Sequence, residues 1–229
     1  MKNFNTIMTY FTSDFIEFFK DLATNNHRDW FHENKKRYEK SVKNPFTNFL
    51  KDLIIEIQKY DKELNIEPKD SILRINRDIR FSKDKSPYNL HYTAFISRGG
   101  KKDKSIPGLF LRFSPEEIGI MAGSYGGSKE QLLGIRNTIQ SDLKQFKLIY
   151  SNKKLIAKFG TIQGEEHKRI PKEFQVSHKK EPLIAKKQFY LVAMRETELL
   201  TSDNLITEIM EYWHTAKPLN DFLTNAIKQ

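Results

Sequence analysis

The chain has 229 residues, a formal net charge of +10 at pH 7 and no cysteine. This length is enough for one large or two small domains with a buried core, and seventeen Phe and nine Tyr indicate a folded globular protein. The absence of cysteine excludes disulfides, thiolate metal sites and cysteine nucleophiles. No apolar run approaches the roughly 20 residues of a membrane span, so we expect no membrane partner.

Two further expectations follow from the N-terminal sequence and from the charge. Asp14 and Glu17 interrupt the first apolar residues, so we expect no signal peptide and a cytoplasmic protein. A pI of about 9.5 is typical of proteins that bind nucleic acid, phosphorylated metabolites or anionic lipids. The lysines occur as scattered pairs, however, which is also the pattern of a solvated surface in a lysine-rich proteome.

Apolar residues at helical spacing predict three helices between about residues 13 and 60. A Ser-Asp pair at 13–14 is suited to begin the first helix, and an Asn-Asn pair at 25–26 ends it. The second helix is expected over about 27–40, and Pro45 suits the first turn of the third.

The middle of the chain predicts a β-sheet. Residues 71–81 alternate between apolar and polar side chains, and residues 92–97 form a second strand. Residues 109–113 and 118–121 are expected to form a hairpin about a Ser-Pro-Glu-Glu turn. Consecutive strands of this kind make an antiparallel meander.

After the hairpin the pattern is again mostly helical. Ser128 and Gln131 form a capping-box pattern at the start of a helix. The elements expected after it are a short helix over 141–150, an irregular segment over 151–187, a strand over 188–195, and two closing helices that begin near Ser202 and Pro218. We therefore predict a single α+β domain over residues 1–229, with a central antiparallel sheet flanked by N-terminal and C-terminal helices.

The densest group of directional polar side chains spans residues 74–91. Alternate residues of a strand share one face, and two guanidinium groups in such a row can bind a phosphate or carboxylate bidentately. The alternative is a solvated ladder of ion pairs on an exposed face. The residues predicted to bind an anion are Arg74, Arg77, Arg80, Ser82, Lys83, Asp84, Lys85 and Tyr88.

Arg77 differs from the others because it alternates with Leu73, Ile75, Ile79 and Phe81, on the face that should be buried. A buried arginine needs a carboxylate or a ring of carbonyl groups. We expect an internal ion pair that ties the helices to the sheet, or else a pocket that opens from the apolar face at this point.

Catalysis in this segment would need a general base, and the candidates are Asp78 and His91. A lone histidine is more often a hydrogen-bonded structural residue than a catalyst. The other histidines show neither HxH nor HExxH spacing, so we expect no metal site, and no cofactor is indicated. The chain has no GxxxxGK[ST] motif, which disfavours nucleotide hydrolysis of the P-loop type.

Four segments together resemble one family that is widespread in bacteria and fungi and is described as a domain of unknown function. They are FFKDLATNNHRDWFHENKKRYE, RDIRFSKDKSPYNLH, IRNTI and IPKEFQVSHKKEPLIAKKQFY. The family signature RDxRFSKDKxPY stands at residues 77–88, and a lysine usually follows it where this chain has Asn89. The resemblance implies a bacterial-type, single-domain α+β protein in which residues 25–31 belong with the signature loop. It implies no activity, cofactor or substrate.

The leading functional hypothesis is a pocket around residues 74–91 that binds a small molecule carrying phosphate or carboxylate. One alternative is a metal-independent hydrolase or transferase that acts on a phosphorylated substrate. Another is a nucleic-acid-binding module, which would show a continuous positive stripe and strongly salt-dependent binding. In a fourth, structural interpretation the segment only locks the helices onto the sheet.

Overall fold

The computed structural model describes residues 9–228, which fall into two compact units. Of the described residues, the first unit comprises 9–95, Leu111–Gly119 and Met194–Met210, and the second comprises Ile96–Phe110, Ile120–Ala193 and 211–228. All four strands of the sheet contribute residues to both units. The expectation of a single domain over residues 1–229 stays a prediction.

The sheet is antiparallel, and its strands lie side by side in chain order, β1-β2-β3-β4. They are β1 (Tyr92–Ile96), β2 (Gly108–Phe113), β3 (Ile118–Ser124) and β4 (Phe189–Arg195). The predicted hairpin is confirmed, and Ser114 closes its turn, since its hydroxyl donates to the carbonyl of Glu117 at 3.0 Å. The chain thus has the predicted α+β fold with an antiparallel meander.

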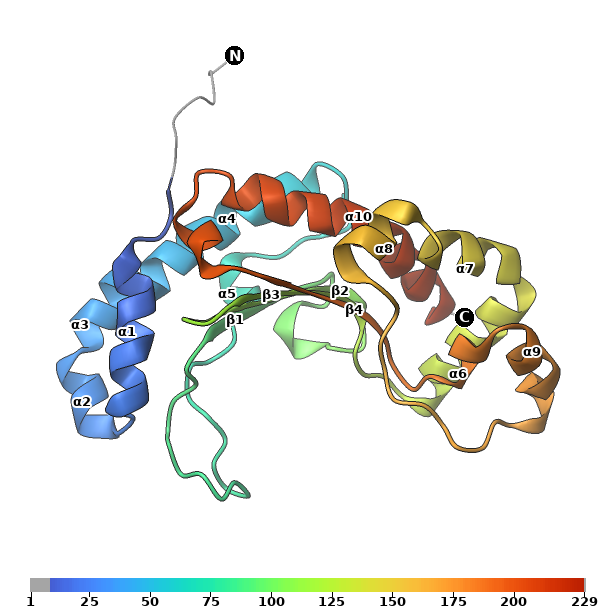
Figure 1. The fold of residues 1–229 in the computed structure, drawn as a ribbon, viewed down its shortest axis with the longest axis horizontal. Helices are drawn as coiled ribbons and strands as arrows, with labels where there is room; N and C mark the ends of the chain where they lie inside the picture. The colour runs from blue at the N-terminus through green and yellow to red at the C-terminus, as the bar shows by residue number, and fades with distance from the viewer. Residues whose placement is uncertain (1–8, 229) are drawn as a thin grey trace, which may run out of the picture. The chain divides into compact units, whose positions relative to one another are not determined.

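Helices dominate the first unit (Figure 1). They are α1 (Ser13–Thr24), α2 (Arg28–Glu33), α3 (Lys35–Tyr38), the π-helix η1 (Glu39–Lys43), α4 (Asn44–Gln58) and α5 (Pro68–Ser71). The three predicted helices are present, and Pro45 lies in the first turn of α4 as expected. Two boundaries differ: Thr12 is the N-cap of α1, and the π-helix joins α3 to α4 where a break was predicted.

Phenylalanine rings form the core of the first unit. They lie at helical spacing on α1 and α4, so each helix buries one face. Phe46 is fully buried, and its ring lies 5.2 Å from the ring of Phe113 and 4.8 Å from that of Tyr92. The buried phenylalanines here are Phe11, Phe15, Phe18, Phe19, Phe46, Phe49, Phe95 and Phe113.

The second unit contains most of the chain after β3. Its helices are α6 (Lys129–Ser141), α7 (Leu143–Tyr150), α8 (Lys153–Phe159), α9 (Gln175–Lys180) and most of α10 (Leu205–Ala226). Short 3-10 turns lie at Gly100–Lys102, Lys172–Phe174, Pro182–Ala185 and, in the first unit, Thr197–Thr201. Among residues 9–228, no helix is both long and apolar enough to cross a bilayer.

Two C-terminal predictions are wrong. Residues 151–187 are not irregular throughout, because Asn152 caps α8 by accepting hydrogen bonds from the N–H groups of its first turn. The two closing helices are one helix, since Pro218 lies inside α10. Leu219 and Leu223 continue the buried stripe beyond the proline, and this packing offsets the lost backbone hydrogen bond. The capping box of Ser128 and Gln131 is confirmed.

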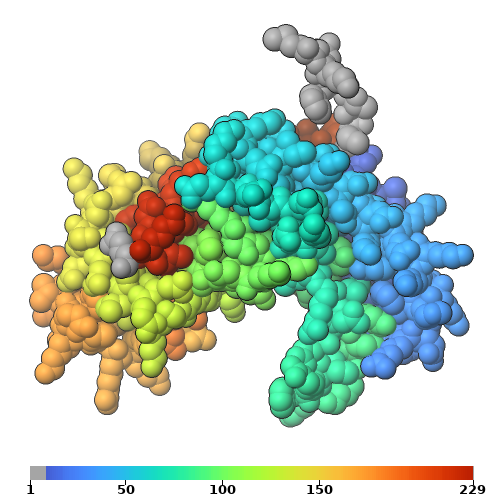
Figure 2. All heavy atoms as spheres, turned by 180° about the vertical axis from the view of Figure 1, so that it is seen from behind, coloured from blue at the N-terminus to red at the C-terminus, as the bar shows by residue number. Residues whose placement is uncertain are grey.

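The predicted strand over residues 71–81 is also wrong. Ser71 ends α5, and the residues after it form only isolated bridges, between Ile72 and Ala94 and between Asn76 and Tyr88. We call residues 73–91 the arm. The arm folds back on itself and projects beside the α1–α3 helices (Figures 1 and 2). The backbone hydrogen bonds of residues 75–89 join the two legs of the arm, from Arg77 to Pro87 and from Asn89 to Ile75 at 2.8 Å each, so this segment does not extend the sheet.

Candidate functional site

The arm is fastened to the N-terminal helices at its second leg. The side chain of Asn26 pairs with the backbone of Tyr88, accepting from its N–H at 3.1 Å and donating to its carbonyl at 3.0 Å. The ring of Phe31 stacks on the ring of Tyr88, with centroids 4.0 Å apart and planes 17° apart. This confirms that residues 25–31 belong with the signature loop, and it fixes one leg of the arm in place.

Arg77 holds the two legs of the arm together. Its guanidinium donates to the Asp84 carboxylate and, at 3.1 Å, to the carbonyl of Ser86. Its side chain is 25% exposed. The prediction that Arg77 ties the helices to the sheet is therefore wrong, because its ionic partner lies on the arm itself. The buried apolar face expected around it is not formed either, because Leu73 and Ile79 are half-buried and Phe81 is 96% exposed.

Asp84 is the acceptor around which the tip is organised. It accepts from the N–H and the hydroxyl of Ser86 at 2.9 and 2.7 Å, as well as from Arg77. The hydrogen bonds from Ser86, with the nearby Arg77 charge, lower the pKa of Asp84 to about 2. Asp84 is thus ionised at neutral pH and serves the arm as a structural anion.

Asp78 and Arg80 pair with each other on the exposed side of the arm. The Asp78 carboxylate accepts from Arg80 Nε at 3.0 Å and from its terminal nitrogen at 2.7 Å. The hydrogen bonds from Arg80 lower the pKa of Asp78. Ser82 is half-buried next to this pair, and its backbone N–H donates to the carbonyl of Ile79 at 3.3 Å.

Three cations of the arm have no carboxylate partner among the described residues. Arg74 and Lys83 are exposed, and Lys85 donates only to the carbonyl of Ile79, at 3.0 Å. The arm carries five basic residues and two carboxylates, which gives it a formal charge of 5 − 2 = +3. Phe81 is 96% exposed, and the guanidinium carbon of Arg80 lies 5.9 Å from its ring centre.

His91 lies where the arm enters β1, away from the tip. Burial, helped by the positive charge of Arg112, lowers the pKa of His91 from 6.5 to about 4, against the opposing influence of Glu116. His91 is therefore neutral at pH 7 and a weak base. Neither His91 nor Asp78 has the near-neutral pKa that general-base catalysis favours, so the arrangement gives no support to a catalytic role for either.

We expect His91 to make the protein less stable in acid. Between pH 6.5 and 4 His91 is protonated in the unfolded chain but not in the folded chain. The free energy of unfolding therefore decreases as the pH falls through this range. Because His91 is only partly buried, solvent screening reduces the effect to about 1–2 kcal/mol. Urea denaturation of wild type and His91→Gln across this range should show the wild type losing more stability. His32→Gln, on exposed α2, should follow the wild type.

The structure places the predicted binding residues on the arm and pairs several of them with each other. Arg77 with Asp84 and Arg80 with Asp78 form ion pairs, whereas Arg74, Lys83 and Lys85 stay available. Sequence patterns alone did not indicate that Asn26 and Phe31 contact the arm. Only the family resemblance linked residues 25–31 to this loop. Among residues 9–228, no group of three or more acidic or histidine side chains could hold a metal ion.

Comparison with known families matches residues 14–222 to the model of a family described as conserved hypothetical protein (DUF2461). No curated protein and no solved structure matches the chain. The match includes α1, the arm, all four strands and most of α10.

Proposed function

The chain belongs to the conserved hypothetical protein family DUF2461, and we propose that this member binds phosphate- or carboxylate-bearing ligands through its arm. The observation that carries the proposal is the excess of charge on a fastened, projecting element. Arg74, Lys83 and Lys85 form no ion pair with a carboxylate of the described chain, although Arg74 lies near enough to Asp78 to lower its pKa. A cytoplasmic location, where such ligands are abundant, is part of the proposal.

The internal pairs of the arm support this function by reducing its conformational freedom. Arg77 and Asp84 join the two legs, and Tyr88 is stacked on Phe31 and bonded to Asn26. A binding element that is ordered before it meets its ligand loses less entropy on binding. In this proposal the ion pairs Arg77–Asp84 and Arg80–Asp78 order the arm, and the cations without an ion pair contact the ligand.

A second candidate ligand is single-stranded nucleic acid, which the exposure of Phe81 favours. The Phe81 ring is 96% exposed, so its faces are accessible to a stacking base. Stacking of a base on such a ring contributes about 1–3 kcal/mol, and neighbouring cations contact the phosphates. The hydrolase or transferase alternative has less support, because neither Asp78 nor His91 is poised to accept a proton at neutral pH.

The test measures binding of a fluorescent oligothymidine to the full chain by anisotropy, with inorganic phosphate and nucleoside monophosphates as competitors. We expect the double variant Arg74→Gln/Lys83→Gln to lose about tenfold in oligonucleotide affinity at low salt. The slope of log affinity against log salt concentration should be smaller in magnitude by about 1.4 for this variant, since two phosphate contacts are lost. Phe81→Ala should weaken the oligonucleotide at least fivefold and leave inorganic phosphate unaffected.

A matched control removes two charges elsewhere. Lys51→Gln/Lys153→Gln changes exposed lysines of α4 and α8 and keeps the same net charge as the arm variant. Equal losses in the two double variants would show a nonspecific charge effect and would overturn the proposal. Competition by monophosphates alone, with no effect of Phe81→Ala, would assign the arm to small anions rather than nucleic acid.

A further inference from the structure

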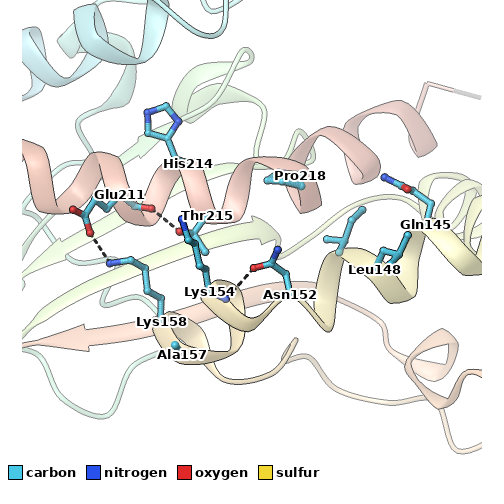
Figure 3. Close-up of a pocket in the computed structure, with 11 residues that line it drawn as sticks. Gln145, Leu148, Asn152, Lys154, Ala157, Lys158, Glu211, His214, Thr215 and Pro218 are labelled. Carbon is cyan, nitrogen blue, oxygen red and sulfur yellow. Dashed lines mark hydrogen bonds and ion pairs between the residues drawn. The ribbon is translucent and has the colours of Figure 1, made fainter.

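A groove in the second unit has no role in the function proposed above. It has a volume of about 770 Å³ and lies along α7, α8 and the part of α10 from residue 211 onward. That volume is within the 300–1,000 Å³ typical of small-molecule sites. Figure 3 shows its lining side chains, which come from both sides of the groove.

The apolar side chains of the lining come from three helices. They are Leu148 and Ile149 of α7, Ala157 of α8 and Pro218 of α10. Leu148 is 59% exposed, whereas Phe146 and Ile149 of the same helix are buried. An apolar ligand segment of several carbon atoms would cover this side chain and remove its surface from water.

Two polar side chains of the lining, Asn152 and Lys154, offer hydrogen-bond donors to a ligand. The side-chain oxygen of Asn152 already accepts from the N–H groups of Lys154 and Leu155, at 2.9 and 3.3 Å, so its amide nitrogen is what it offers to the groove. Lys154 is exposed, and no described carboxylate pairs with its ammonium group. In Figure 3 the side chains of Asn152 and Lys154 both extend toward α10.

The carboxylate in the lining is already neutralised. Glu211 pairs with Lys158 at 3.0 Å, and the Lys158 ammonium lies 4.3 Å from the centre of the Tyr212 ring. Thr215 donates its hydroxyl to the carbonyl of Glu211 at 2.7 Å. The charge left to a ligand is therefore positive, so a ligand with an anionic head is complementary to the groove and one with a cationic head is not.

From these observations we infer that the groove binds small amphipathic carboxylates. The carboxylate accepts hydrogen bonds from Lys154 and Asn152, and an unbranched hydrocarbon tail lies against Leu148, Ala157 and Pro218. This inference is independent of the arm, which lies in the first unit.

The probe is octanoate below its micellar concentration, titrated into the ¹⁵N-labelled full chain and followed by NMR. We expect saturable shifts confined to residues 143–158 and 211–218. Butanoate should bind at least tenfold more weakly, since it lacks four methylene groups, and octylammonium at least fivefold more weakly. Lys154→Gln should weaken octanoate about fivefold, whereas the matched variant Lys153→Gln, exposed but outside the lining, should not.

Three results would overturn the inference. The first is the absence of saturable shifts. The second is a lack of specificity for the anionic head, because that would show nonspecific apolar binding. It would appear as equal affinity for octanoate and octylammonium, or as equal effects of the two lysine variants on octanoate binding. The third is a concentration-dependent dimer that Leu148→Glu dissociates, which would assign the groove to a second copy of the chain.

Discussion

Replacing Phe46 with alanine is expected to lower the free energy of unfolding by about 3–5 kcal/mol. Phe46 is fully buried, and its ring packs against the rings of Tyr92, Phe113, Phe49 and Phe11 at centroid distances of 4.8 to 6.3 Å. Truncation removes the burial of the ring and leaves a cavity that surrounding rings on rigid elements cannot fill. The midpoint and slope of urea denaturation measure the loss.

Phe81→Ala is the matched control, because it makes the same chemical change at a ring that is 96% exposed. Its effect on stability should stay within about 0.5 kcal/mol, even though it weakens binding to the arm in the test above. A comparable loss of stability in both variants would mean that Phe81 packs against the protein in solution. A small loss in Phe46→Ala would mean that the aromatic core can close around the cavity.

The elements that could be predicted from the sequence are those with local signals. Ser128 and Gln131 cap α6 reciprocally, and the Ser-Pro-Glu-Glu turn joins β2 to β3, because both depend on residues within four positions of one another. The stripes of α1 and α4 are equally local, since spacing alone determines which face a helix can bury.

The errors arose where distant packing decides the structure. Residues 71–81 alternate between apolar and polar side chains as a strand would, but this alternation does not specify whether the segment pairs with the sheet or with residues 87–89 of the arm. Pro218 is a helix breaker in isolation, and only the buried stripe on both sides of it explains its place inside α10.

The candidate site was predictable in composition but not in pairing. The sequence shows that five cations and two carboxylates are close together, but not that Arg77 pairs with Asp84 and Arg80 with Asp78. The fold of the arm chooses those pairs and so decides which cations remain for a ligand. The groove of the second unit was missed because α8 was not predicted; the cap at Asn152 and the spacing of Leu155 and Phe159 are the signals that could have indicated it.

Gly123→Ala is expected to destabilise the protein by about 3 kcal/mol or more. Gly123 lies in β3 with φ of +121°, which side chains rarely adopt, and an added Cβ would lie 2.3 Å from the carbonyl oxygen of Phe189 on β4. This atom and the next nearest, Cα of Tyr190 at 2.7 Å, belong to the backbone, so rotation of a side chain cannot relieve the contacts; the two strands would have to separate. Gly126→Ala, with no atom within 4 Å of its added Cβ, should change the urea midpoint little. Equal midpoints for the two variants would contradict the close approach of β3 and β4 at Gly123.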